Sequence, residues 1–191
     1  MRRRALLALP ALLPVAGLPV ATLAQRRGEG TLTQALDTLF AMLKSAPDEA
    51  AARQVEARIW QAWMMQGTPA VQLLMRRGVR NIEAQALADA LEDFDAVIAL
   101  SPEIAEGWNK RATVYFLMQQ DDNSSRDILE TLVREPRHFG ALAGLSMVRE
   151  RQGDLSGALR AWESALAIYP RMAGGEERLR LLRRQAIGED L

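Results

Sequence analysis

The chain has 191 residues, of which 49% are hydrophobic and 25% are charged, and its basic and acidic residues balance at 24 each. This balance excludes the broad positive field of a nucleic-acid-binding protein, and the absence of cysteine excludes disulfides, thiolate metal sites and a cysteine nucleophile. The abundance of Ala, Leu, Arg and Glu favours helices, and the length is that of a single domain.

Residues 1–24 have the pattern of a secretory signal peptide. Three arginines follow Met1, an apolar run covers residues 5–24, and small residues precede the polar Gln25. A membrane anchor formed by residues 5–24 is the alternative, but the three prolines and one glycine in this run make a poor long helix. We therefore expect cleavage near Ala24 and a periplasmic or secreted protein. Its net charge falls to about −3, because the three arginines are removed with the signal.

Two helices are expected before the main part of the chain. Residues 25–31 are expected to form a flexible segment, and residues 32–44 and 48–66 have helical apolar periodicity. Asp48 is a plausible N-cap of the second helix, which Gly67-Thr68-Pro69 closes. We interpret residues 32–68 as a degenerate helical hairpin that covers the exposed face of the first downstream unit.

A period of 34 residues organises residues 69–170. Within each unit, large apolar residues recur at helical spacing, which predicts two helices with apolar faces. Small residues recur where two helix axes must approach closely, and a proline ends each unit because it stops the second helix. The columns in register are Pro102, Pro136 and Pro170; Leu74, Trp108 and Leu142; Gly78, Ala112 and Ser146; Ala90, Ser124 and Ala158; and Phe94, Ile128 and Trp162.

This pattern resembles the tetratricopeptide repeat. The third unit carries the Gly153-Asp154 turn, Ala158, Trp162 and a terminal Pro170, at the positions where that family has them. The second unit has Gln119-Gln120-Asp121 in place of the Gly-Asp turn, so its turn is expected to be looser.

The resemblance implies an all-α fold, a right-handed α-solenoid of about three helix hairpins. We place the repeats at residues 69–102, 103–136 and 137–170. A charged capping helix is expected in residues 171–187, where it shields the last repeat from solvent.

No catalytic or metal-binding arrangement is recognisable, so we expect no enzyme activity, no metal and no cofactor. His138 is the single histidine, and it can supply neither a two-histidine zinc site nor a serine triad without a nucleophile elbow. We expect it to be a structural turn residue, with contact to a partner as the alternative. The acidic clusters Glu92-Asp93 with Asp95, and Asp121-Asp122, are expected to be solvated.

The resemblance implies that a protein or peptide partner binds the inner surface, which the first helix of each pair lines. The convex or terminal surface is the alternative. The lining does not reproduce the lysines and asparagines that clamp peptide C-termini in some family members, and an extended or helical segment with apolar anchors suits it better. The inward-facing candidates are Met75, Val79, Ile82, Glu106, Asn109, Lys110, Thr113, Phe116, Ala143, Met147 and Glu150.

Two functions remain open from the sequence. The first is a non-catalytic scaffold or adaptor that holds a protein segment in the periplasm. The second is a structural subunit of an envelope complex, or a protein that assembles with itself. Membrane contact is expected only through an uncleaved signal or a partner complex.

Overall fold

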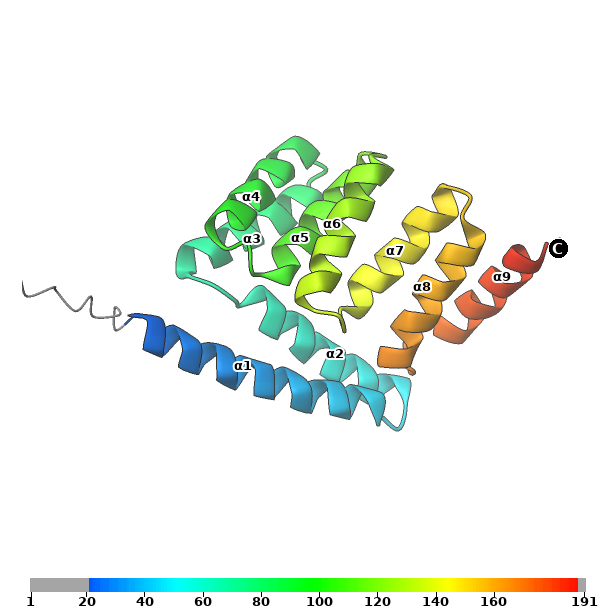
Figure 1. Ribbon diagram of the computed structural model, residues 1–191, viewed down its shortest axis with the longest axis horizontal. Helices are drawn as coiled ribbons and strands as arrows, with labels where there is room; N and C mark the ends of the chain where they lie inside the picture. Colours follow the sequence, from blue (N-terminus) through cyan, green and yellow to red (C-terminus); the bar gives the residue numbers. More distant parts are fainter. Residues whose placement is uncertain (1–20, 189–191) are drawn as a thin grey trace, which may run out of the picture.

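The computed structural model describes residues 21–188, and within this range every regular element is an α-helix (Figure 1). Of the predicted signal peptide, residues 1–24, residues 1–20 lie outside the described residues, and residues 21–24 are the start of the first helix. In the described range, no helix combines the length and the apolar character needed to cross a membrane. The helices are α1 Ala21–Lys44, α2 Glu49–Met64, α3 Pro69–Glu83, α4 Leu87–Leu100, α5 Ala105–Leu117, α6 Asp121–Arg134, α7 Phe139–Arg151, α8 Leu155–Ile168 and α9 Gly175–Ile187.

Helices α3 to α8 form three hairpins that stack side by side, which confirms the predicted all-helical repeat architecture (Figure 1). The small columns lie where the two helices of a hairpin meet. A methyl group on Gly78 would lie 2.5 Å from Cζ of Phe94, so no larger residue fits there without movement. Ala90, Ser124 and Ala158 are likewise buried. Close packing of this kind explains why residue size recurs every 34 residues.

The three turns inside the hairpins share one geometry, so the looser turn expected in the second repeat was wrong. Gln85 has a φ of +59°, Gln119 of +60° and Gly153 of +80°. Each turn also repeats the same backbone hydrogen bonds to the end of the preceding helix, as in Gln120 N–H to Tyr115 O and Asp154 N–H to Arg149 O. Glutamine therefore adopts the left-handed conformation that glycine takes more readily in the third repeat.

Ion pairs cross the first two hairpins at equivalent positions. Arg77 Nε lies 2.6 Å from Asp93 Oδ1, and Arg111 contacts Asp127 through Nε at 2.7 Å and Nη2 at 2.9 Å. The bonds to Asp127 raise the pKa of Arg111 above its ordinary value, against the effect of burial. Asp93 is buried, so its expected solvation was wrong: a carboxylate can be buried when a guanidinium compensates it.

The third hairpin lacks this ion pair. Leu145 and Ala161 stand 34 residues after Arg111 and Asp127 and replace the charges by apolar side chains. The first two hairpins therefore fill this position between their helices with a buried ion pair, and the third fills it with apolar side chains.

Helix α1 begins earlier than expected. Residues 25–31, interpreted as a flexible segment, are part of this 24-residue helix. No proline interrupts Ala21–Lys44, and Gly28 and Gly30 each disfavour helix by only about 1 kcal/mol. The predicted N-cap of α2 is confirmed, because the Asp48 side chain accepts a hydrogen bond from Ala51 N–H at 2.8 Å.

The α1–α2 hairpin does not cap the first repeat as expected. It lies across the ends of the repeat helices, beneath the stack in Figure 1, and its apolar core continues into Phe139 and Tyr169 of the third repeat. Only the end of α2, at Met64, packs against the core of the first repeat. The ion pair between Arg137 and Asp37, at 2.7 Å, also joins α1 to the third repeat.

Helix α9 covers the last repeat at the C-terminal end of the stack (Figure 1). Leu179 and Leu182 are buried against it, and Trp162 Nε1 donates to Gly175 O at 2.9 Å. Arg178 pairs with Glu150, Nη1 to Oε1 at 3.3 Å, and so links this helix to α7.

Candidate binding groove

Two tryptophans of α2, Trp60 and Trp63, pack against the first turns of α5 and α7. We call this contact surface, formed by Glu106, Lys110, His138 and Gly140, the seat of α2. The Trp63 ring is 1% exposed and stacks on the His138 ring, with centroids 4.1 Å apart and an interplanar angle of 7°. Trp60 lies over Gly140, where a methyl group would come within 2.6 Å of Cη2. The Lys110 ammonium lies 5.1 Å from the centre of the Trp60 ring. At the N-terminal ends of α5 and α7, the inner surface of the stack is therefore covered by α2 of the same chain.

His138 is fully buried and joins the two repeats beneath the tryptophans. Its Nδ1 accepts the Ala141 N–H at 3.0 Å, which caps α7. Because Nδ1 is an acceptor there, the ring proton is on Nε2, which donates to Glu106 Oε2 at 2.9 Å. This histidine has a structural role in the turn, as expected. Its ring also packs against Trp63 of α2.

Glu106 is a buried carboxylate held by three side chains. Oε2 accepts from His138 and from Asn109 Nδ2 at 3.1 Å, while Oε1 lies 3.1 Å from Lys110 Nζ. Burial alone raises the pKa of Glu106, but Lys110 and His138 outweigh it and hold the pKa below its ordinary value. The carboxylate is therefore charged in the native protein at neutral pH.

Glu106→Gln is expected to lower the free energy of unfolding at neutral pH by about 1–3 kcal/mol, because Lys110 loses its counter-charge and His138 and Asn109 lose a charged acceptor. A depressed folded-state pKa means that the carboxylate stabilises the native state above its ordinary pKa of 4.5. That contribution is lost as pH falls through the folded-state value. Urea unfolding at several pH values should therefore show wild type and variant converging below pH 4.5.

The matched control for this pH dependence is Glu163→Gln. The Glu163 carboxylate also has a basic partner, Arg183 at 2.9 Å, but its side chain is 43% exposed. We expect a change of less than about 1 kcal/mol at any pH. A stability difference between Glu106→Gln and wild type that stays constant through acid would contradict the assignment of a charged Glu106.

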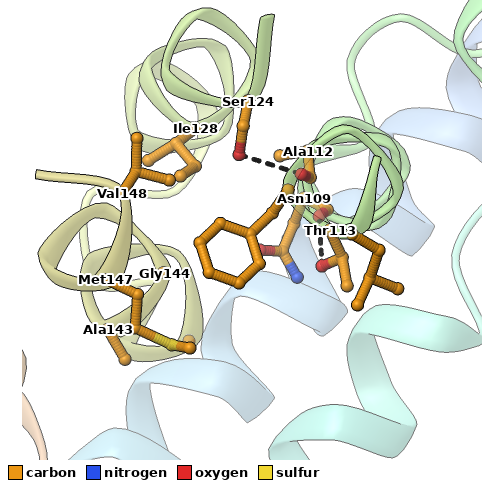
Figure 2. A pocket seen from close by; sticks show the side chains of 12 residues that line it. Asn109, Ala112, Thr113, Ser124, Ile128, Ala143, Gly144, Met147 and Val148 are labelled. Carbon is orange, nitrogen blue, oxygen red and sulfur yellow. Dashed lines mark hydrogen bonds between the residues drawn. The ribbon is translucent and has the colours of Figure 1, made fainter. Parts of the chain in front are cut away.

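Beyond the covered turns, α5 and α7 enclose an open pocket of about 350 Å³, with α6 as its inner wall. Figure 2 shows Asn109 and Thr113 on one side, Ala143 and Met147 on the other, and Ser124 and Ile128 between them. The lining carries no charged side chain. Leu117 and Met147 are large apolar residues exposed at its margin. Its residues are Asn109, Ala112, Thr113, Phe116, Leu117, Ser124, Ile128, Gly140, Ala143, Gly144, Met147 and Val148.

A second, more open hollow of about 520 Å³ adjoins the first and shares Phe116 and Met147 with it. Charged groups line its far side, but each has a partner within the chain. Arg151 Nε lies 2.8 Å from Asp121 Oδ2, and its guanidinium lies 3.9 Å from the centre of the Phe116 ring. The pair of Arg178 with Glu150 forms the remaining wall.

The structure divides the sequence-predicted site residues into three groups. Those that line the two hollows are Asn109, Thr113, Phe116, Ala143, Met147 and Glu150. Those that lie beneath α2 are Glu106, which is fully buried and so cannot contact a partner, and Lys110, which is paired with Glu106 and lies against Trp60. Those that pack in or against the core of the first repeat are Met75, Val79 and Ile82.

Met75 cannot belong to the predicted binding surface, because it lies in the apolar core of the first repeat. Val79 and Ile82 are only partly buried against that core, so their role in binding stays a prediction. Met75 is 1% exposed and lies in one cluster with Phe94 and Val114. Helical periodicity identifies a face, but it does not show whether a neighbouring helix covers that face.

Gly144 is one of the pocket residues that sequence reasoning missed. In the 34-residue repeat, Gly144 occupies the position that Arg76 and Lys110 hold in the first two repeats, so the third repeat has no side chain where the others have a long one. A methyl group there would meet only Ile128 Cδ1, at 3.6 Å, which is ordinary contact. This break in the column was the available signal, because removing a long side chain from an inner helix leaves a hollow.

The site shows no arrangement for metal chemistry. Within residues 21–188, no group of three or more His, Asp or Glu side chains is placed to hold a metal ion. The described acids near the groove are instead paired with arginine, lysine or histidine.

Comparisons with known proteins identify a close relative. No protein-family model matches the chain. A TPR repeat-containing protein of Rhizobium etli is 37% identical over 164 residues, which make up 86% of this chain and 80% of the relative.

Solved structures share the fold at lower identity. The first TPR domain of Spaghetti (RPAP3), bound to the HSP90 peptide SRMEEVD, gives a TM-score of 0.60 at 16% identity over 64% of this chain and 96% of that domain. The Sgt2 TPR domain of Aspergillus fumigatus gives 0.60 at 20% identity, over 65% and 83% of the two chains. MamA gives 0.57 at 17% identity, over 84% and 85%.

Proposed function

Because the chain belongs to the tetratricopeptide repeat (TPR) proteins, we propose that it is a non-catalytic scaffold that holds a segment of another protein between α5 and α7. The apolar pocket of about 350 Å³ on the inner surface carries this proposal. A pocket of this size takes one or two large side chains, and Phe116, Leu117 and Met147 supply apolar contact for them. The Spaghetti domain, which shares the fold, is bound to an HSP90 peptide, and this supports a peptide-holding role for the present stack.

Gly144→Leu is expected to abolish partner binding while the fold is kept. The site of the new Cβ is open, and replacing glycine inside a helix favours folding by about 0.5–1 kcal/mol, whereas the leucine branches would occupy the pocket. The measurement is affinity capture from the envelope fraction with quantitative mass spectrometry. Proteins bound in the groove should fall by about tenfold or more relative to wild type.

Gly144→Ala is the matched control, because a single methyl group at this position makes only ordinary contact and leaves most of the pocket open. It should retain the same proteins as wild type. If wild type, Gly144→Leu and Gly144→Ala all captured the same proteins equally well, the groove would not be the binding surface. The helical content of each variant, from circular dichroism, separates lost binding from lost folding.

We also propose that the protein acts in the periplasm after removal of its N-terminal signal. The basic start and the apolar run over residues 5–24 support this location. Expression of the full chain, followed by fractionation and intact-mass measurement, is expected to give a periplasmic species that lacks about 24 residues. An uncleaved chain in the membrane fraction would favour the anchored alternative.

A further inference from the structure

The seat of α2 and the open pocket form one continuous trough along α5 and α7. Gly140 belongs to both, because it lies beneath Trp60 and also lines the pocket. Asn109 likewise lines the pocket and donates to Glu106 in the seat. One half of the trough therefore already holds an amphipathic helix with aromatic anchors, and the other half is empty.

The far margin of the empty half lies one helix spacing from α2. Lys110 lies beneath Trp60, and Phe116 lies about 9 Å further along α5, because a helix rises about 1.5 Å per residue. Packed helices have axes about 8–10 Å apart. A helix lying beside α2 at this distance would lie over Phe116 and Met147, where the two hollows meet, and Gly144 would allow one of its large side chains to enter the pocket.

The polar groups of the trough offer an extended backbone few hydrogen bonds. The Thr113 hydroxyl donates to Asn109 O at 3.0 Å, and the Ser124 hydroxyl donates to Ala112 O at 2.9 Å (Figure 2). One N–H of the Asn109 amide is donated to Glu106, which leaves its second N–H and its Oδ1 for a partner. An extended segment would leave most of its own N–H and C=O groups without protein partners here, whereas a helix satisfies them internally.

The cations near the trough are also already paired. Lys110 is bound to Glu106, Arg151 to Asp121, and Arg178 to Glu150. A free C-terminal carboxylate would have to compete with an internal carboxylate for each of them. The trough therefore favours an uncharged, apolar face over a charged chain end.

We propose that the occupant is an amphipathic helix of the partner protein, packed side by side with α2, with a large apolar side chain in the pocket over Gly144. This inference rests on the proposed function and specifies the class of segment that the groove takes. It excludes an extended peptide and a peptide anchored by its C-terminal carboxylate.

The experiment is a selection from a displayed library of random 16-residue peptides, the length of α2, on the full chain with counter-selection on Gly144→Leu. The most enriched peptide is then synthesised, with variants carrying a central proline or an amidated C-terminus. We expect apolar residues at helical spacing, and gain of helical circular dichroism on binding. Central proline should weaken affinity by about tenfold or more, and amidation should change it by less than about twofold.

Two outcomes would overturn the helix inference in different ways. Enriched peptides that tolerate central proline, or that need a free carboxylate, would show groove binding by another kind of segment, and the proposed function would stand. A failure to enrich any peptide on wild type over Gly144→Leu would count against the proposed function as well. Thr113→Trp, which enters the pocket from α5, is a second blocking variant in case Gly144→Leu does not fold.

Discussion

Asp127→Ala is expected to lower the free energy of unfolding by about 3–5 kcal/mol, because it leaves a partly buried guanidinium without its main partner. The Asp127 side chain is 3% exposed and receives two hydrogen bonds from Arg111, whose side chain is 17% exposed. Removing one member of a buried pair costs far more than the pair contributes relative to apolar residues. Urea unfolding monitored by circular dichroism measures the effect.

Asp95→Ala is the matched control, because it removes the other carboxylate from the same arginine. Arg111 Nη1 lies 2.6 Å from Asp95, but that side chain is 51% exposed, so we expect a loss of less than about 1 kcal/mol. The double variant Arg111→Leu with Asp127→Ala copies Leu145 and Ala161 of the third repeat and should recover most of the stability. If Asp95→Ala and Asp127→Ala cost the same, burial of the pair is not the cause.

Trp63→Ala is the second large effect, with an expected loss of about 3–5 kcal/mol. The ring is fully buried between α1 and the His138–Phe139 turn, with ring centroids 6.0 Å from Phe40, 4.1 Å from His138 and 5.4 Å from Phe139. Its removal opens a cavity at the point where the α1–α2 hairpin meets α7. Hydrogen exchange followed by mass spectrometry should show the largest loss of protection in α1 and α2.

Trp63→Phe controls for the size of the side chain, because it retains an aromatic ring that can pack on His138. We expect about half the loss or less, since most of the buried surface remains. Equal loss of amide protection across α3 to α8 in Trp63→Ala would contradict a local role. The ring would then support the whole stack rather than the docking of one hairpin.

The repeat architecture could be predicted from the sequence because local and non-local requirements coincide in it. Gly78 must be small because Phe94 lies against it, and the same constraint recurs in each unit. Such constraints make small and large residues recur at a fixed spacing, which can be recognised in a single sequence.

The docking of the N-terminal hairpin could not be predicted in the same way. The apolar stripe of α2, with Val55, Ile59 and Trp63, shows that this face is buried but does not name its partner. Contacts with His138 and Tyr169 depend on how three repeats curve past one another. The same gap explains why Glu106 and Lys110 were taken for binding residues, since neither charge nor spacing indicates that another helix lies over them.

The buried acids were missed for a different reason. Asp93 was considered only with its sequence neighbours, and Asp127 was not singled out at all. Their partners, Arg77 and Arg111, lie 16 residues earlier, on the other helix of each hairpin. Both members recur at the 34-residue period, so a search for paired columns of opposite charge would have found them.

The placement of the α1–α2 hairpin has a consequence for the order in which the chain folds. Most contacts in a repeat stack are between neighbours, so such a stack folds by local steps. Asp37 and Arg137 are 100 residues apart, and Glu56 accepts a hydrogen bond from Tyr169, 113 residues later. Closing loops of this length requires the third repeat to be formed already. Helices α1 and α2 are therefore synthesised before the repeats but are buried after them, and their apolar stripe stays exposed until the third repeat has formed.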